Sequence, residues 1–448
     1  MMNSKAKTTP PLRGTPPQEG NNSPSLKGWQ AKPDGVVPKL RFPEFRGGAL
    51  RSVRLGDVTE EGRSRNGNKH SVASVMGVTK ADGIVPMEAR LIAADIARYK
   101  VVEKDWFAYN PMRLNIGSIA RWKGESEILV SPDYVVFKCN TDSESGIDPG
   151  YLDYFRQTKT WEEFVTEGGD GSVRVRIYYK DIARVGLALP SLAEQQKIAE
   201  CLSSVDELMA AQARKVDALK THKKGLMQQL FPREGETQPR LRFPEFQNAG
   251  EWKKEPLGSM CARIMDGTHF SPKSKGGPRP YLTSKNIKDG RIDLSNLSYI
   301  SEEEHAEIYS KCPVKLHDVL LTKDGANTGN CALNNLDFEF SLLSSVAVLR
   351  GNPSKLRQEF LFQSILSDSA QSLITESMSG QAITRITLTK IGGITISVPS
   401  PGEQRRIASC LSSLDALITS ETQKLEALKT HKKGLMQQLF PSPEEAEA

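Results

Sequence analysis

Long hydrophobic runs are missing from this sequence of 448 residues. No apolar stretch approaches the roughly 20 residues needed to span a bilayer, and the N-terminus has no apolar core of the signal-peptide kind. We therefore expect a cytoplasmic protein with no membrane partner. The 38% of hydrophobic residues is ordinary for a chain that folds into two or three domains.

Cysteine is scarce and is never paired at metal-binding spacing. The six cysteines are far apart and form no CxxC motif: Cys139, Cys201, Cys261, Cys312, Cys331 and Cys410. This pattern excludes a zinc ribbon and a disulfide framework, and it predicts free thiols in a reducing compartment.

Catalytic motifs are absent as well. The phosphate-binding string GxxxxGK[ST] does not occur, so we expect no ATP hydrolysis by this chain. Asn110, Pro111 and Met112 are only a truncated imitation of an amino-methyltransferase motif. Asp133, Glu251 and Lys253 lie in different segments and cannot be assumed to converge on a cation. The four histidines outside the repeated block lack metal-ligand spacing: His70, His269, His305 and His317. We predict no catalytic residue and no metal site.

A tandem repeat is the dominant feature that is present. The 43-residue block from Pro190 to Pro232 recurs from Pro399 to Pro441 with 28 identical positions, at an offset of 209 residues. The segments before the two blocks open alike, with PKLRFPEF at Pro38 and PRLRFPEF at Pro239, and then diverge. Prolines in these openings predict extended chain. A constant spacer that carries two different recognition domains would produce this pattern of conserved blocks and diverged segments within one chain.

The repeat divides the chain into alternating segments of two kinds. Residues 1–37 are rich in Pro, Ser, Gly and Asn, which predicts a disordered tail. The remaining segments are a mixed α/β segment at 38–190, a helix at 191–232, a second mixed segment at 239–399, a second helix at 400–441 and a tail at 442–448. This α+β organisation is a pseudo-two-fold tandem repeat of two similar α/β domains separated by two long helices.

Heptad spacing predicts that the two helices form a coiled coil. Because a globular segment separates the two helices in the chain, we expect them to pair antiparallel. In that arrangement Gln212 faces Glu421, and the two side chains share a hydrogen bond. The alternative is that both side chains snorkel toward solvent at the edge of the seam. Lys223 and Lys432 are also polar seam positions. A helix of this length is about 60 Å long, enough to space two readers along DNA. The predicted seam is Ile198, Leu202, Val205, Met209, Gln212, Val216, Leu219, Leu226 and Leu230, with Ile407, Leu411, Leu414, Ile418, Glu421, Leu425, Leu428, Leu435 and Leu439.

The two mixed segments share sequence features despite their divergence. Each has an Asn-x-Gly turn, at Asn115 and at Asn327, followed by an apolar run that predicts a strand, at 131–138 and 344–350. Each closes on a Gly-led basic segment, GSVRVRIYYKDI and GQAITRITLTKI. One shared fold is therefore expected.

Several strings together resemble the DNA specificity subunit of type I restriction-modification enzymes. They are EQQKIAECLSSVDELM and EQRRIASCLSSLDALI at the helix starts, YNPMRLNIGS and SPDYVVF in the first mixed segment, and DGTHFSP with PYLTSKNI in the second. The resemblance implies two target recognition domains that read the halves of a bipartite, asymmetric site in double-stranded DNA. It also implies that the helices bind two methyltransferase subunits, that motor-nuclease subunits join for cleavage, and that this chain is not itself an enzyme. Adenosylmethionine, ATP and Mg would then bind the partner subunits, with no cofactor on this chain.

Polar and basic side chains in loops are the candidates for DNA contact. A solvated surface charge is the alternative for each of them, and Arg113 and Lys323 beside the Asn-x-Gly turns are weaker candidates. The candidates are Arg63, Arg65, Asn66, Lys69, Arg174, Arg176 and Tyr178 in the first mixed segment, and His269, Ser271, Lys273, Lys275, Lys285, Gln381 and Arg385 in the second.

The outer faces of the two helices repeat unchanged and predict two docking sites for one kind of partner. The repeated residues are Lys220, Lys223, Lys224, Met227 and Gln228, and again Lys429, Lys432, Lys433, Met436 and Gln437. Two other functions stay open at this point: a self-sufficient DNA methyltransferase or nuclease with fused recognition domains, and a coiled-coil scaffold that binds protein. The net charge of +6 permits a polyanionic partner without requiring one.

Overall fold

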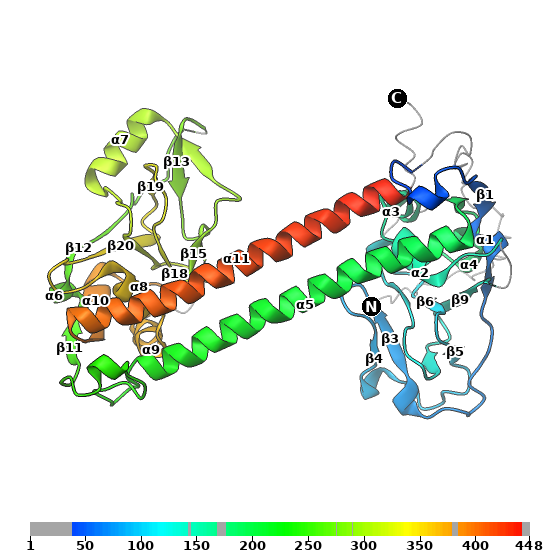
Figure 1. Ribbon diagram of the computed structural model, residues 1–448, viewed down its shortest axis with the longest axis horizontal. Helices are drawn as coiled ribbons and strands as arrows, with labels where there is room; N and C mark the ends of the chain where they lie inside the picture. Colours follow the sequence, from blue (N-terminus) through cyan, green and yellow to red (C-terminus); the bar gives the residue numbers. More distant parts are fainter. Residues whose placement is uncertain are drawn as a thin grey trace, which may run out of the picture. The chain divides into compact units, whose positions relative to one another are not determined.

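The computed structural model describes residues 38–141, 145–167, 176–274, 276–288, 290–378 and 384–440. The two predicted tails, 1–37 and 442–448, lie outside the described residues. The chain forms two compact units (Figure 1). Unit 1 takes the residues up to Met209 and those from Leu428 onward, and unit 2 takes Ala210–Ala427. Each long helix therefore contributes residues to both units.

Unit 1 is built around a four-stranded sheet of strand order β2-β9-β6-β7. Two antiparallel pairs, β3 with β4 and β5 with β8, form separate two-stranded sheets, and β1 pairs with β10 where the domain begins and ends. The strands are β1 Arg51–Arg54, β2 Thr59–Glu61, β3 Met76–Thr79, β4 Gly83–Pro86, β5 Lys100–Val102, β6 Phe107–Tyr109, β7 Ile119–Arg121, β8 Ile128–Val130, β9 Val135–Cys139 and β10 Gly186–Leu189. The short helices are α1 Leu55–Val58, α2 Pro149–Phe155, α3 Lys159–Glu167 and α4 Tyr179–Ile182.

Unit 2 repeats this plan around a four-stranded sheet of order β12-β20-β17-β18, with β11 paired to β21. It adds a three-stranded sheet, β16-β13-β19, and the hairpin β14-β15. The strands are β11 Lys253–Pro256, β12 Cys261–Asp266, β13 Arg279–Leu282, β14 Ile287–Lys288, β15 Arg291–Ile292, β16 Ser298–Ile300, β17 Val319–Thr322, β18 Cys331–Leu333, β19 Ser341–Leu342, β20 Val346–Gly351 and β21 Thr395–Val398. The short helices are α6 Leu257–Met260, α7 Glu302–Lys311, α8 Gln358–Leu366, α9 Asp368–Ser377 and α10 Leu388–Gly393.

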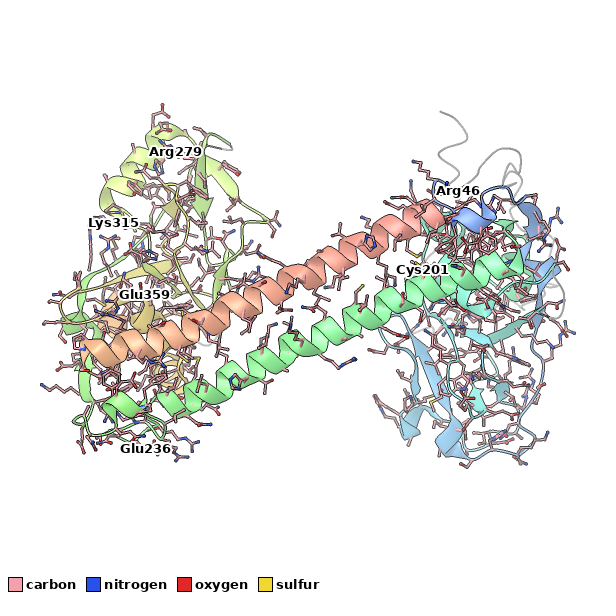
Figure 2. All side chains as sticks on the ribbon, viewed as in Figure 1. Arg46, Cys201, Glu236, Arg279, Lys315 and Glu359 are labelled. Carbon is pink, nitrogen blue, oxygen red and sulfur yellow. The ribbon has the colours of Figure 1, made fainter. Side chains whose placement is uncertain are left out.

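The expectation of one shared fold is confirmed by the equivalent strand orders of the two four-stranded sheets. The predicted strands at 131–138 and 344–350 correspond to β9 and β20, although β9 begins only at Val135 because a turn occupies the residues before it. Unit 2 differs mainly where β13, β16 and α7 form an outer lobe. Arg279 of β13 lies in this lobe (Figure 2) and holds α7 through an ion pair with Glu302 at 2.7 Å.

The long helices are α5 Leu192–Leu230 and α11 Pro401–Leu439, within one or two residues of the predicted bounds. Both starts are capped by serine, because Ser191 Oγ accepts from Glu194 N at 3.3 Å and Ser400 Oγ accepts from Glu403 N at 3.4 Å. Each helix has 39 residues, which corresponds to about 58 Å at 1.5 Å per residue. None of the helices in the described part of the chain is long and apolar enough to cross a membrane.

Every predicted seam position is buried or half-buried on the helices. Inside unit 2 the pairing is antiparallel: as α5 advances from Gln212 to Lys223, its partners on α11 step back from Glu421 to Asp415. Gln212 Nε2 donates to Glu421 Oε2 at 2.7 Å and to the Glu421 carbonyl at 2.8 Å. The register hypothesis was correct, and the alternative of two snorkelling side chains was wrong.

Two further ion pairs in the coil are related by the repeat. Lys223 Nζ lies 2.7 Å from Asp415 in unit 2, and its counterpart Lys432 Nζ lies 2.7 Å from Asp206 in unit 1. The lysines are mostly buried in these pairs. Lys223 and Lys432 were among the repeated residues expected to form docking faces, but they stabilise the pairing of the helices instead.

The helix ends complete the two hydrophobic cores. The core of unit 1 contains Ile198 and Leu202 of α5 together with Leu439 and Phe440 at the end of α11. The core of unit 2 has the matching set, Ile407 and Leu411 of α11 with Leu230 and Phe231 at the end of α5. The repeated sequence LMQQLFP therefore forms part of two cores, which explains why its apolar positions do not vary between the copies.

The two openings PKLRFPEF and PRLRFPEF dock on the helix starts. Arg41 Nε donates to Glu194 at 2.8 Å, and Arg242 makes two hydrogen bonds to Glu403 at 2.9 and 2.7 Å. All four side chains are nearly inaccessible. The extended chain predicted here is interrupted by single 3-10 turns, Pro43–Phe45 and Pro244–Phe246, because proline at the first position presets a turn.

Candidate nucleic-acid interface

The β6–β7 turn of unit 1, residues 110–118, is a tight loop held by its own backbone. Asn110 Oδ1 accepts from Met112 N at 2.9 Å, and Ser118 N donates to the Arg113 carbonyl at 3.0 Å. Gly117 has φ of 90°, a left-handed conformation that strains other residues. The Asn-x-Gly pattern thus corresponds to a rigid turn.

The segment that contains Arg176 and Tyr178, two of the predicted DNA contacts, lies against this turn. Ile177 N donates to the Pro111 carbonyl at 3.0 Å, and the Ile177 side chain is buried. Because Ile177 anchors the segment, its neighbours Arg176 and Tyr178 are held at the surface next to the turn, and both are exposed. Residues 110–118 and 176–178 together are called the first turn surface.

Unit 2 has the equivalent second turn surface, residues 323–330 with 384–386. Ile386 N donates to the Lys323 carbonyl at 2.9 Å, and Gly325 N donates to the Thr384 carbonyl at 2.9 Å. Ile386 is buried, Arg385 is exposed, and Gly329 has φ of 100°. The two units therefore present the same pair of segments in the same arrangement, with different side chains.

A chain of ion pairs joins the second turn surface to the DGTHFSP loop. His269 Nε2 lies 3.4 Å from Asp266 Oδ1, and Asp266 Oδ2 lies 3.2 Å from Lys323 Nζ. Lys323 Nζ also lies 3.4 Å from Asp324 Oδ2, and Asp324 Oδ1 lies 3.1 Å from Arg385 Nε. Two of the predicted contact regions, at His269 and at Arg385, are thus brought together by alternating charges.

Lys323 cannot contact DNA directly, because its side chain is only 2% exposed. The prediction of Lys323 as a weaker candidate for DNA contact was therefore wrong. Its buried ammonium group instead neutralises the carboxylates of Asp266 and Asp324. The terminal members of the chain, His269 and Arg385, are more than half exposed and can reach a ligand. A buried cation between two carboxylates fixes the directions of these exposed groups.

The basic loop of unit 1 near Arg63 is organised by Asn66. Asn66 is fully buried, its Oδ1 accepts from His70 N at 2.8 Å, and its Nδ2 donates to the carbonyls of His70 and Ile96. Asn66 was therefore wrong as a DNA contact, because its amide is satisfied inside the loop. Arg63, Arg65 and Lys69 remain exposed, and Arg65 donates to the Arg98 carbonyl at 2.8 Å.

The exposed residues of the DGTHFSP loop follow a turn that only glycine fits. A Cβ on Gly267 would lie 1.9 Å from the Leu342 carbonyl oxygen. His269, Ser271 and Lys273 are exposed beyond it, and the Lys273 amide donates to Glu304 at 2.6 Å. Lys285 is also exposed, in the turn before β14. Three predicted contacts, Arg174, Lys275 and Gln381, lie outside the described residues.

Sequence reasoning missed three exposed residues of the first turn surface or beside it. Met112 and Ile116 are 49% and 55% exposed, although apolar residues in such a string predict burial. Lys80 belongs to the β3–β4 hairpin, and its side chain lies over Gly117, with Cγ 3.2 Å from an ideal Cβ there. The turn itself was noted, but nothing in the sequence places Lys80 beside it.

The described residues offer little for catalysis. Among them, no group of three or more His, Cys, Asp or Glu side chains is placed to hold a metal ion. All six cysteines are free thiols. Burial raises the pKa of Cys261 and of Cys312 to about 12, and it also raises the pKa of Cys139, so these thiols stay protonated and are poor nucleophiles.

Comparison with known proteins agrees with the fold. Residues 249–430 match the family described as the type I restriction modification DNA specificity domain. The chain is thus similar to the type I restriction-modification specificity subunits. It is 25% identical to the putative type I restriction enzyme MjaX specificity subunit of Methanocaldococcus jannaschii over 77% of this chain and 80% of that protein. It is also 25% identical to the MjaVIII specificity subunit of the same organism, over 66% of this chain and 70% of that one.

Solved structures of specificity subunits share the fold. The type I restriction-modification S subunit from M. genitalium aligns with a TM-score of 0.60 at 14% identity and covers 91% of this chain and 100% of its own. A chain from a structure concerned with complex assembly and conformational transition of the type I R-M system aligns with a TM-score of 0.51 at 18% identity, covering 89% and 98%. The predicted fold class, two α/β domains with long coiled-coil helices, is confirmed.

Proposed function

We propose that this specificity subunit reads a bipartite, asymmetric site in double-stranded DNA, with one half-site bound by each turn surface. The observation that carries the proposal is the equivalence of the two surfaces: Ile177 and Ile386, 209 residues apart, anchor an exposed arginine beside the same kind of glycine turn. Equivalent frameworks with unlike side chains are what two readers of unlike sequences require.

Arg176 and Arg385 are the contacts supported best. Both are exposed, both immediately precede the equivalent anchoring isoleucine, and Arg385 is oriented by Asp324. An arginine held in this way can make a bidentate contact to guanine or a contact to phosphate. Further exposed residues are proposed as supporting contacts: Arg63, Arg65, Lys69, Tyr178, His269, Ser271, Lys273 and Lys285.

The chain supplies recognition, and its partners supply chemistry. It acts in a complex with other restriction-modification subunits, and we propose two methyltransferase subunits and, for cleavage, motor-nuclease subunits. Adenosylmethionine, ATP and Mg would bind those partners and not this chain. Recognition by this subunit would then direct adenine methylation or DNA cleavage to one site.

The test is to measure DNA binding by the complex of this chain with its methyltransferase subunits. Arg176→Ala and Arg385→Ala are each expected to weaken binding to the target and, if the arginine contacts phosphate, to lower the salt slope by about 1. Methylation-sensitive sequencing of host DNA supplies the target, since one bipartite motif should lose methylation when the gene is deleted.

Arg240→Ala is the matched control, because Arg240 is exposed and pairs with Glu236 outside both turn surfaces. It should bind DNA as the wild type does. Wild-type affinity in both the Arg176 and the Arg385 variants, or no loss of any methylated motif on deletion, would refute the proposed function.

A further inference from the structure

The first turn surface ends in two large apolar side chains, whereas the second turn surface exposes no apolar side chain larger than alanine. Met112 and Ile116 are about half exposed at the tip of the β6–β7 turn. At the tip of the equivalent turn in unit 2 the exposed residues are Ala326 and Asn327. Because the frameworks match, the difference lies in what the tips can recognise.

The apolar tip is surrounded by positive charge. Arg113 lies between Met112 and Ile116 in the turn, Arg176 follows from the adjacent segment, and Lys80 lies over Gly117. Among the described residues, no carboxylate forms an ion pair with any of these three cations. An acidic, repeating partner such as the DNA backbone fits this rim, whereas a purely apolar protein surface would leave three charges uncompensated.

The tip is also rigid. Met112 N is bonded to Asn110 Oδ1, and Ile116 N donates to the Arg113 carbonyl at 3.3 Å. Pro111, between the two segments, is buried and accepts from Ile177. A turn fixed in this way holds its two apolar side chains outward without collapse onto the sheet, so their exposure is built into the fold.

We propose that Met112 and Ile116 are specificity-determining residues that contact thymine 5-methyl groups in the major groove. The 5-methyl group is the apolar feature that distinguishes base edges there, and apolar side chains recognise it by contact. Arg113, Arg176 and Lys80 would hold the flanking phosphates. This inference rests on the proposed function and adds that thymine is read by methyl contact in the half-site of unit 1. Ile116 stands there at the position that Thr328 occupies in unit 2, where the threonine hydroxyl donates to the Gly325 carbonyl.

Deoxyuridine in place of thymine tests the inference, because it removes only the 5-methyl group. The full chain in complex with its methyltransferase subunits is titrated with target DNA in which all thymines of one half-site, and then of the other, are replaced. Wild-type affinity should fall about fourfold for each methyl group contacted in the half-site of unit 1.

The double variant Met112→Ser, Ile116→Ser should lose this sensitivity in one half-site and bind thymine and uracil DNA equally there. Both residues are exposed, so the variant should fold, which thermal unfolding checks. Leu91→Ser is the matched control: Leu91 is 60% exposed in unit 1, in a 3-10 turn that is not part of the first turn surface, and its variant should keep the wild-type preference for thymine.

Three results would overturn the inference: no effect of uracil on the wild type, an unchanged uracil effect in the double variant, or a target whose half-sites contain no thymine. These results are distinct from failure of the proposed function. In that case the complex would not discriminate target DNA from scrambled DNA at all.

Discussion

Lys323 shows how a buried charge positions exposed ones. It neutralises Asp266 at 3.2 Å and Asp324 at 3.4 Å, and these carboxylates hold His269 and Arg385 at the surface. Removing the central cation leaves two carboxylates with no counter-charge beneath them, which is costlier than losing one surface pair.

Lys323→Met should therefore destabilise unit 2 by about 3 kcal/mol. The measurement is urea unfolding followed by circular dichroism, with Lys285→Met, an exposed lysine of the same unit, expected to stay within about 0.5 kcal/mol of the wild type. A Lys323 variant as stable as the Lys285 variant would show that the ion-pair chain does not hold the turn.

Individual side chains were the least predictable part of the candidate site. Residue type and loop composition identified Arg176, His269 and Arg385 in regions that the fold brings to the two turn surfaces or links to them. The same criteria chose Asn66, which is buried, and missed Lys80. Whether a polar side chain satisfies its own loop or faces solvent depends on tertiary hydrogen bonds that the sequence does not reveal.

At the level of elements, the two long helices were predicted closely because their apolar positions repeat over nearly six heptads between prolines. Strand limits were less predictable. β9 was expected from Ser131 but begins at Val135, since Ser131 to Tyr134 form a turn closed by a backbone hydrogen bond of 3.0 Å. Short strands carry too few residues for periodicity to fix their ends.

The coil also contains a carboxylate whose charge depends on its neighbours. Hydrogen bonds from Gln212, and further ones from Lys424 and Lys215, lower the pKa of Glu421 to about 2. A carboxylate whose pKa is lowered in the folded state contributes its full stabilisation of that state above about pH 5. This contribution to the free energy of unfolding disappears as the pH falls toward 2.

Thermal unfolding of the chain should therefore show a steeper loss of stability between about pH 5 and pH 2 in the wild type than in Glu421→Gln. Gln212→Ala removes the largest cause of the lowered pKa, so its loss of stability should be smaller and should be complete at a higher pH than in the wild type. Parallel pH profiles for all three proteins would mean that the Gln212 hydrogen bond does not stabilise the ionised carboxylate.

On the scale of the whole molecule, the repeat supplies matching helix surfaces to both units. Of the residues expected to form docking faces, Lys223 and Lys432 pair inside the coil, and Gln228 donates to Asp368 at 2.9 Å. Lys224 and its counterpart Lys433 are exposed. They are the repeated pair that remains best suited to bind a partner.

Native mass spectrometry of the complex should show two methyltransferase subunits for each chain. Lys224→Glu and Lys433→Glu should each weaken the binding of one copy, and the double variant should weaken both, because the two surfaces carry the same residues. Saturation at one copy in the wild type would contradict this stoichiometry. Lys180→Glu, an exposed lysine of α4, is the control that should leave both copies bound.

Gln212 and Glu421 are the same position of the repeat, so the coil pairs each copy with its own counterpart at that point. An amide can donate to and accept from another amide, whereas two ionised carboxylates repel. A fragment carrying only the first helix would thus retain a group able to pair with itself in a homodimer, and a fragment carrying only the second would oppose self-association. One amide-to-acid difference therefore favours joining the unlike halves of a single polypeptide over joining two identical ones.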